Sequence, residues 1–165
     1  MSIIRSRVWK LGDAIDTDII IPARHLVLPL AEMKQKAMEP LRPTFAAEVR
    51  AGDVLVAGKN FGCGSSREQA PAVLKELGIS AIVAISFARI FFRNAINLGI
   101  PAIECSEVYE HVQEGDSIEI DPASGLVRLP GRDLEFSGSR LPGFLLEIIR
   151  AKGLIPYLTT TKGAQ

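Results

Sequence analysis

Residues 58–68, with the sequence GKNFGCGSSRE, hold the residue types best suited to chemistry. The three glycines of this segment can adopt positive φ and allow the backbone to approach a ligand closely. Ser65 and Ser66 are adjacent hydroxyls, and Arg67 adds a cation directly after them. Because a helix is predicted to begin here, its first N–H groups would favour a negative charge. The segment is therefore predicted to bind a carboxylate.

The two serines also have a structural explanation. The sequences that begin at Ser65 and at Ser66 both match the capping box, in which a serine is followed three residues later by Glu or Gln. Such a cap contributes about 1 kcal/mol to helix stability. Since one helix has one N-cap residue, one hydroxyl would remain for another role. A functional serine and a purely capping pair are both compatible with the residues.

Arg67 requires a compensating anion. A cation in the first turn of a helix is disfavoured by about 0.3–1 kcal/mol. A bound carboxylate that accepts two hydrogen bonds would offset this cost, and so would an ion pair with Glu68 or with an aspartate of the loop at residues 16–18. That loop, Asp-Thr-Asp, can also be explained by turn chemistry, in which carboxylates accept hydrogen bonds from nearby N–H groups.

Several other kinds of site are disfavoured. The glycine segment matches neither the phosphate-binding P-loop nor the dinucleotide-binding pattern. Cys63 has no histidine near it in sequence that could activate it, so it is predicted to pack. The two cysteines, Cys63 and Cys105, and the two histidines, His25 and His111, have no recognisable metal-ligand spacing. We therefore expect reduced thiols and no metal ligands in this chain.

Composition narrows the class of protein. The chain has 165 residues, of which 47% are hydrophobic, and is predicted to form a single domain over 1–165 with a frayed tail from about residue 159. Lys and Arg total 19, as do Asp and Glu, so no broad charge favours nucleic acid or an anionic membrane. No apolar run approaches the roughly 18 residues of a membrane span, and no signal segment is evident. A soluble, cytoplasmic protein is expected.

The elements that must position the glycine segment alternate between strands and helices. Strands are predicted at 3–11, 53–58, 81–85 and 101–105, and helices at 66–77 and 89–98. This alternation is typical of right-handed βαβ crossovers on a parallel sheet. Short strands at 117–121, 126–129 and 134–136 predict an antiparallel section, and a helix is predicted at 141–152. The fold class is α/β. The proline-broken loop at 26–43, with a short helix at 31–38, is typical of a ligand lid.

Three motifs occur in a distinctive order: DTDIIIP at 16–22, NFGCGSSRE at 60–68 and SFARIFFRN at 86–94. With these motifs the chain resembles the small subunits of 3-isopropylmalate dehydratases, which belong to the aconitase superfamily. The resemblance runs from about residue 3 to beyond residue 141. It implies the swivelling β/β/α domain of aconitases, with a mixed sheet or barrel and flanking helices.

The resemblance also implies a reaction. The enzyme would be a hydro-lyase that isomerises 2-isopropylmalate and 3-isopropylmalate in leucine biosynthesis, active only with a large subunit. That subunit would carry a 4Fe–4S cluster, and this chain would bind no cofactor. Ser65 would act as the base, with its alkoxide stabilised by helix N–H groups and a guanidinium. Ser66 and Arg67 would hold a carboxylate of the hydroxy-dicarboxylate substrate. Asp18 would lie at the active site, and Arg24 would bind substrate, although its spacing from Asp18 is shorter than in aconitases.

In the family that the chain resembles, the segment after the Asp-Thr-Asp loop reads the γ group of the substrate. Here it contains the aliphatic residues Leu26, Val27 and Leu28. They suit an isopropyl or methyl group, whereas a third carboxylate would need a paired cation. Isopropylmalate is thus favoured over the homocitrate of homoaconitase. Homoaconitase, dimethylmalate dehydratase and methylmalate dehydratase remain alternatives, as does a non-catalytic regulatory module that binds an anion.

Overall fold

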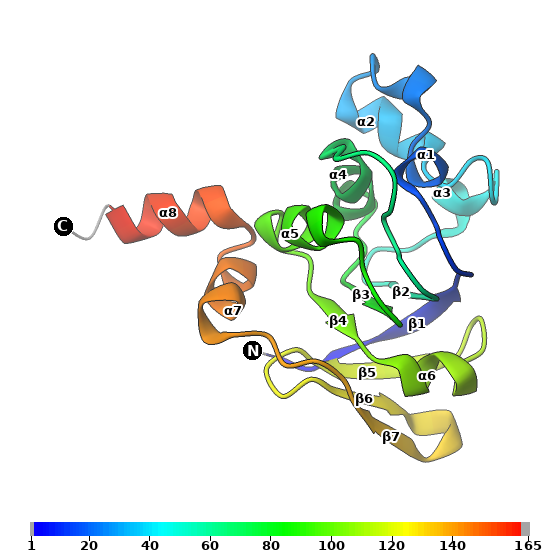
Figure 1. Ribbon diagram of the computed structural model, residues 1–165, viewed down its shortest axis with the longest axis vertical. Coiled ribbons are helices and arrows are strands. Elements are labelled where there is room, and N and C mark those ends of the chain that lie inside the picture. The colour runs from blue at the N-terminus through cyan, green and yellow to red at the C-terminus, as the bar shows by residue number, and fades with distance from the viewer. Residues whose placement is uncertain (1, 163–165) are drawn as a thin grey trace.

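One sheet of seven strands forms the centre of the molecule (Figure 1). The computed structural model describes residues 2–162. The strand order is β4-β3-β2-β1-β5-β6-β7. The strands are β1 (Ile4–Lys10), β2 (Val54–Ala57), β3 (Ala81–Ala84), β4 (Ala102–Glu104), β5 (Ser117–Asp121), β6 (Leu126–Leu129) and β7 (Leu134–Ser137).

The helices connect and cover these strands. Between β1 and β2 lie α1 (Thr17–Ile20), α2 (Leu30–Met33) and α3 (Phe45–Glu48), with the 3₁₀ turns η1 (Ala23–His25) and η2 (Lys34–Lys36). The crossovers to β3 and β4 contain α4 (Gln69–Glu76) and α5 (Arg89–Asn97). The remaining helical elements are α6 (Ser106–His111), η3 (Pro130–Arg132), α7 (Gly143–Arg150) and α8 (Leu154–Lys162).

Strand β1 is the junction between two halves of the sheet. It pairs in parallel with β2 on one side and antiparallel with β5 on the other. β2, β3 and β4 continue the parallel half, and β6 and β7 continue the antiparallel half. β2 and β3 are buried along their whole length, as expected for apolar strands covered on both faces. The predicted α/β class and the change of character after Gly115 are confirmed.

The sheet curls so that its two edges approach each other. The chain that leaves β7 returns to the edge strand β4, where the Ser139 N–H donates to the Glu104 carbonyl oxygen at 2.7 Å. The Glu104 N–H in turn donates to Ser139 Oγ at 2.9 Å. Apolar side chains from both halves, among them Val54, Ile118 and Phe136, therefore share one core cluster on the inner face. The family resemblance implied a mixed sheet or barrel, and the structure has a strongly curled mixed sheet.

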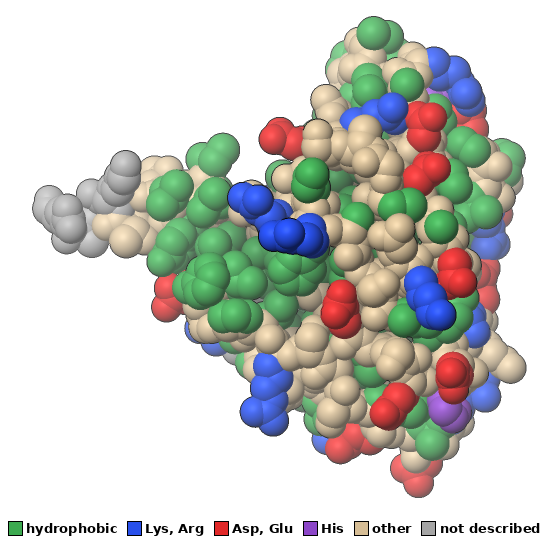
Figure 2. Space-filling view, viewed as in Figure 1, with side chains coloured by type: hydrophobic (Ala, Val, Ile, Leu, Met, Phe, Trp, Pro, Cys, Tyr) green, Lys and Arg blue, Asp and Glu red, His purple; other side chains and the backbone are tan. Residues whose placement is uncertain are grey.

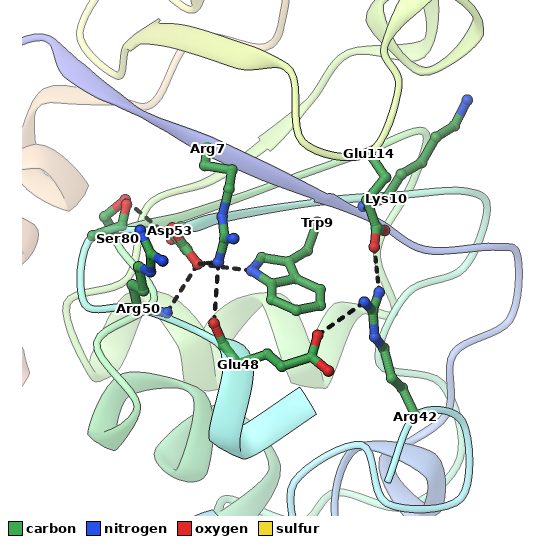
Figure 3. A network of polar contacts seen from close by, with 10 residues as sticks. Arg7, Trp9, Lys10, Arg42, Glu48, Arg50, Asp53, Ser80 and Glu114 are labelled. Atoms are coloured by element: carbon green, nitrogen blue, oxygen red, sulfur yellow. Dashed lines mark hydrogen bonds and ion pairs between the residues drawn. The ribbon is translucent and has the colours of Figure 1, made fainter. Parts of the chain in front are cut away.

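A buried carboxylate holds β1 to the start of β2 (Figure 3). Asp53 is 4% exposed, and its Oδ2 accepts hydrogen bonds from Arg7 Nη2 at 2.7 Å, Trp9 Nε1 at 2.8 Å and the Arg50 N–H at 2.9 Å. Burial opposes ionisation of Asp53. The three donors and the positive charge of Arg7 outweigh it, so the pKa of Asp53 lies below its usual value. The network lies at the amino ends of the parallel strands and is structural.

Several helix boundaries differ from the predictions. The helix predicted over 141–152 is shorter, Gly143–Arg150, and the short helix predicted at 31–38 is α2 followed by η2, which ends at Lys36. The helix predicted over 66–77 begins three residues later, at Gln69. The predicted frayed tail is wrong for residues 159–162, which continue α8. Thr159, Thr160 and Thr161 each donate a hydroxyl hydrogen bond to the carbonyl oxygen four residues earlier, at 2.8–2.9 Å. Residues 163–165 lie outside the described part of the chain.

Candidate active site

The glycine segment and the loop after β3 meet at the carboxyl ends of two neighbouring parallel strands. An isolated parallel bridge joins Phe61 to Phe87. The Phe61 N–H donates to the Ser86 carbonyl oxygen, and the Ala88 N–H donates to the Phe61 carbonyl oxygen, both at 3.0 Å. In open α/β sheets, ligands bind in the crevice outside the carboxyl ends of the strands. The motifs at 60–68 and 86–94 are therefore parts of one site.

Two glycines allow this segment to pack closely. Gly62 has a φ of +78°, and a Cβ atom at this position would lie 2.1 Å from Phe91 Cγ. Its N–H donates to the Ile15 carbonyl oxygen at 2.8 Å. Gly64 has a φ of +95°, and a Cβ there would lie 3.2 Å from Thr17 Oγ1. Glycine thus lets the segment fit between α5 and the Asp-Thr-Asp loop.

Ser65 contacts Thr17 instead of capping a helix. The Ser65 N–H donates to Thr17 Oγ1 at 3.1 Å, and the two hydroxyl oxygens are 3.0 Å apart. Thr17 is 3% exposed, and its own N–H donates to the Cys63 carbonyl oxygen at 2.8 Å. The N-cap of α4 is Glu68, which makes no side-chain capping bond. The prediction that Ser65 or Ser66 caps a helix is wrong, because Ser65 lies in a bend that contacts Thr17 and α4 begins only at Gln69.

The anion that compensates Arg67 is Asp18. Arg67 Nη1 donates to Asp18 Oδ1 at 2.6 Å and to the Ile21 carbonyl oxygen at 3.2 Å. The hydrogen bond from Arg67, the hydrogen bond from the Ala23 N–H and the nearby charges of Arg67 and Arg24 hold the pKa of Asp18 below its usual value. Of the partners considered for Arg67, which were a bound carboxylate, Glu68 and a loop aspartate, the structure shows the loop aspartate in contact with it.

Turn chemistry accounts for the first aspartate of the same loop. Asp16 is the N-cap of α1, and its Oδ1 accepts a hydrogen bond from the Ile19 N–H at 2.7 Å. The three residues of the Asp-Thr-Asp motif therefore divide their roles. Asp16 shapes the turn, Thr17 contacts Ser65 and Asp18 contacts Arg67.

Arg24 lies near Asp18 but is bound to another carboxylate. Its Nη2 donates to Glu39 Oε2 at 2.8 Å, and His25 Nε2 lies 2.7 Å from the same oxygen. The hydrogen bond with His25, followed by that from Arg24, holds the pKa of Glu39 below its usual value. The side chain of Arg24 is 65% exposed. Glu39 occupies only its Nη2, and the other guanidinium nitrogens have no hydrogen-bond partner among the described residues.

The structure does not bring the predicted specificity residues to Ser65. Val27 is 88% exposed, while Leu26 and Leu28 pack against the main core cluster. None of the three borders the depression beside Ser65 in the described part of the chain.

A depression of about 380 Å³ lies beside Ser65 and is bordered by the first turns of α5. Arg89 and Arg93 of that helix line it. The sequence did not predict a role for either arginine, although both belong to the SFARIFFRN motif, which could have indicated them. The same helix also contacts the loop, since Asn94 Nδ2 donates to the Ser66 carbonyl oxygen at 3.4 Å. The site therefore combines a hydroxyl pair, Ser65 with Thr17, and several cations.

The described residues gather no set of metal ligands. Among residues 2–162, no three His, Cys, Asp or Glu side chains lie together in a way that could hold a metal ion. Cys63 is half-buried in the loop, and Cys105 is buried, which raises the pKa of its thiol. A 4Fe–4S cluster does not fit the described residues. Within the same range, no helix is both long and apolar enough to cross a membrane.

Known proteins share this architecture and sequence. Residues 34–108 match the family described as the aconitase C-terminal domain. A crystal structure of a 3-isopropylmalate dehydratase from Methanocaldococcus jannaschii has a TM-score of 0.93 and 41% identity, covering 99% of this chain and 98% of that chain.

Curated relatives agree with the structural match. An isopropylmalate/citramalate isomerase small subunit from Methanocaldococcus jannaschii is 51% identical over 95% of this chain and 94% of its own length. The 3-isopropylmalate dehydratase small subunit of Halothermothrix orenii is 48% identical over 92% of this chain and 93% of its own length. That of Clostridioides difficile is 45% identical over 98% of this chain and 99% of its own length. The chain belongs to the family of 3-isopropylmalate dehydratase small subunits, within the aconitase superfamily.

Proposed function

We propose that this chain supplies the proton-transferring part of a hydro-lyase active site that interconverts 2-isopropylmalate and 3-isopropylmalate in leucine biosynthesis. The reaction removes water from the substrate and adds it back with the hydroxyl on the neighbouring carbon. Ser65 is the base that takes the proton α to a carboxylate and returns it during rehydration. Family membership supports the reaction class, and the surroundings of Ser65 support its role.

The contact between Ser65 and Thr17 is the observation that carries this proposal. Thr17 Oγ1 accepts the Ser65 N–H, and it lies 3.0 Å from Ser65 Oγ. A neutral Ser65 can donate to or accept from Thr17, but a Ser65 alkoxide can only accept. The Thr17 hydroxyl then donates a hydrogen bond to the alkoxide. Such a charge-assisted bond is shorter and about twice as strong as a neutral one. The pair therefore favours the deprotonated state that a serine base requires.

Arg67 retains donors for a substrate carboxylate. Both of its contacts use Nη1, and its Nε and Nη2 have no hydrogen-bond partner among the described residues. A planar guanidinium that offers two parallel N–H groups suits bidentate binding of a carboxylate. Asp18 fixes the orientation of Arg67 through the other nitrogen. In this proposal Ser66 contributes its hydroxyl to the same carboxylate.

The rest of the site is proposed to lie on a large subunit. The relatives are named small subunits, and this chain's described residues offer no ligand set for a metal. We place the 4Fe–4S cluster in that partner. Arg24 and the residues Leu26, Val27 and Leu28 would contact substrate once the partner closes the site.

The experiment that tests the proposal combines this chain with its large subunit under anaerobic conditions. Absorbance of the unsaturated intermediate follows the reaction. Ser65→Ala is expected to lower kcat by about 10²–10⁴-fold, the usual contribution of a general base. Ser117→Ala, which changes an exposed serine on β5, should retain wild-type turnover. Full turnover by Ser65→Ala would show that Ser65 is not the base.

Citramalate, the 2-methyl analogue, is the second candidate substrate. It is favoured by the name of the Methanocaldococcus jannaschii relative, which is 51% identical. The uncharged Leu26, Val27 and Leu28 suit an alkyl group of either size and lack a cation for a third carboxylate. We predict that isopropylmalate and citramalate have a kcat/KM at least tenfold above that of homocitrate. A preference for homocitrate would contradict this assignment of the segment.

A further inference from the structure

A second hollow lies next to the Ser65 depression. It is a groove of about 510 Å³ between α5 and the segment that leads into α7. Figure 2 shows hydrophobic side chains gathered over the region of α7, directly beside Lys and Arg side chains over α5. The lining is mostly apolar, with charged residues among it. Apolar residues of the lining are Phe87, Phe92, Leu141, Pro142 and Leu145; the charged residues are Arg89, Arg93, Arg140 and Glu104.

The apolar part of the groove is an incompletely covered edge of the core. Phe87, Phe92 and Leu145 are only partly buried, although they pack against a buried cluster that includes Leu141. The rings of Phe87 and Phe92 have centroids 6.0 Å apart. Phe144, which precedes Leu145 in α7, is 62% exposed. A contiguous apolar surface of this kind, rimmed by polar residues, marks a protein interaction site.

The cations of the groove lack anionic partners among residues 2–162. Arg89, Arg93 and Arg140 form no ion pair within the part of the chain that the structure describes, whereas Arg5 and Arg132 are each paired with a carboxylate. The lining contains three arginines and a single carboxylate, that of Glu104. The Glu104 Oε1 accepts a hydrogen bond from the Phe87 N–H at 3.2 Å. The groove therefore suits a partner with acidic side chains around an apolar contact.

The groove and the site are parts of one surface. Arg89 and Arg93 line both the groove and the depression beside Ser65. A protein that covers Ser65 must therefore lie against the same two arginines, and it reaches the apolar groove next to them. This continuity selects the occupant, because the proposed function requires a large subunit to complete the site at Ser65.

We propose that the groove between α5 and α7 is a docking site for the large subunit, which inserts apolar side chains against Phe92 and Leu145 and presents carboxylates to Arg89, Arg93 and Arg140. The proposal rests on the proposed function, since that function supplies the partner. It adds the surface and its chemistry. The closest alternative occupant is a second copy of this chain.

Two variants test the docking site, and both lie away from the Ser65 depression. Arg140→Glu reverses an exposed charge, and Leu145→Asp places a carboxylate in the apolar lining. Each is expected to raise the Kd for the purified large subunit at least tenfold, as measured by titration with a labelled small subunit. At saturating large subunit, kcat should return to within twofold of wild type. Arg140→Glu should also weaken the dependence of Kd on salt concentration, because it removes a screened attraction.

Arg50→Glu is the matched control. It makes the same charge change on an exposed residue at the amino ends of the strands, opposite the groove, and should leave Kd within twofold of wild type. Circular dichroism checks that Leu145→Asp is folded. If Leu145→Asp does not fold, Arg140→Glu, which changes an exposed residue, tests the proposal by itself. Unchanged Kd for Arg140→Glu would overturn the docking site. The docking site would also be overturned if the variants lost self-association in sedimentation experiments while their binding to the large subunit stayed unchanged. The Ser65→Ala result would stand in either case, so the two proposals can fail separately.

Discussion

At the scale of single residues, the structure replaces helix capping as the explanation for the serines, while Ser65 keeps its place in the candidate site. Local spacing predicted that one serine caps a helix, but Ser65 is bound by Thr17, which is 48 residues away in sequence. No local pattern reveals such a contact. In contrast, an anion beside Arg67 was expected among the loop aspartates, and Asp18 accepts its hydrogen bond at 2.6 Å. The helix-dipole reason for that expectation does not hold, because Arg67 lies before Glu68, the N-cap of α4. The need of an arginine for a counter-charge could be predicted from sequence, whereas a contact between two hydroxyls could not.

A prediction for Thr17 follows at this scale. Thr17→Val keeps the shape of the side chain and removes the hydroxyl that faces Ser65. We expect kcat to fall by about 10–100-fold, since a hydrogen bond to a charged group contributes about 1.5–3 kcal/mol. The rising limb of the pH–rate profile should move to higher pH, because the Ser65 alkoxide loses a donor. The measurements are steady-state kinetics across pH with the large subunit.

Thr17→Ser is the control for this prediction. It restores the hydroxyl and should recover most of kcat and the original pH profile. A general loss of structure would lower activity in Thr17→Val without moving the profile. An unshifted profile would therefore remove Thr17 from the proposed mechanism.

At the scale of elements, the strands were the most predictable part. Apolar runs such as Val54–Ala57 and Ala81–Ala84 are buried strands with the predicted positions. Helix α8 was missed, because Gly153 and Pro156 with three consecutive threonines do not form an apolar periodic face. Pro156 lies in the first turn, where a missing N–H is tolerated. The sequence also could not show whether the loop at 26–43 is ordered. In the structure this loop contains short helices, and Met38 within it is buried.

The buried carboxylate that joins β1 to β2 gives a prediction about stability. Asp53→Asn leaves Arg7 and Trp9 facing a neutral group and should lower the free energy of unfolding by about 3 kcal/mol at pH 7. Since the folded pKa of Asp53 is below its usual value of 3.8, its contribution is complete above that value. It is lost as pH falls through the folded pKa. Chemical denaturation of both proteins between pH 7 and pH 3 measures the effect.

The difference between wild type and Asp53→Asn should therefore narrow as the solution becomes acidic. Glu135→Gln, which removes an exposed partner of Arg128 on β7, should change stability little at any pH. A constant gap between wild type and Asp53→Asn down to pH 3 would contradict the assigned ionisation of Asp53.

At the scale of the whole molecule, the curled sheet carries the candidate active site at one end of its parallel strands. The carboxyl ends of β2, β3 and β4 carry, in turn, the Ser65 loop, the Phe87 loop and Glu104. The amino ends carry the structural Asp53 network (Figure 3). The sequence motifs identified the family, and the residues that they proposed for the site lie at this end of the sheet. They could not show that Arg89 and Arg93 link the Ser65 depression to an apolar groove, because that link depends on how α5 packs beside the chain entering α7.

The central claim is that Ser65 removes the substrate proton, and a single-turnover measurement tests it most directly. The chain and its large subunit are mixed anaerobically with saturating 2-isopropylmalate, and absorbance reports formation of the unsaturated intermediate as the C–H bond breaks. Ser65→Ala should slow this step by about 10²–10⁴-fold while its Kd for the large subunit stays at the wild-type value. Formation of the intermediate at the wild-type rate by Ser65→Ala would contradict the account.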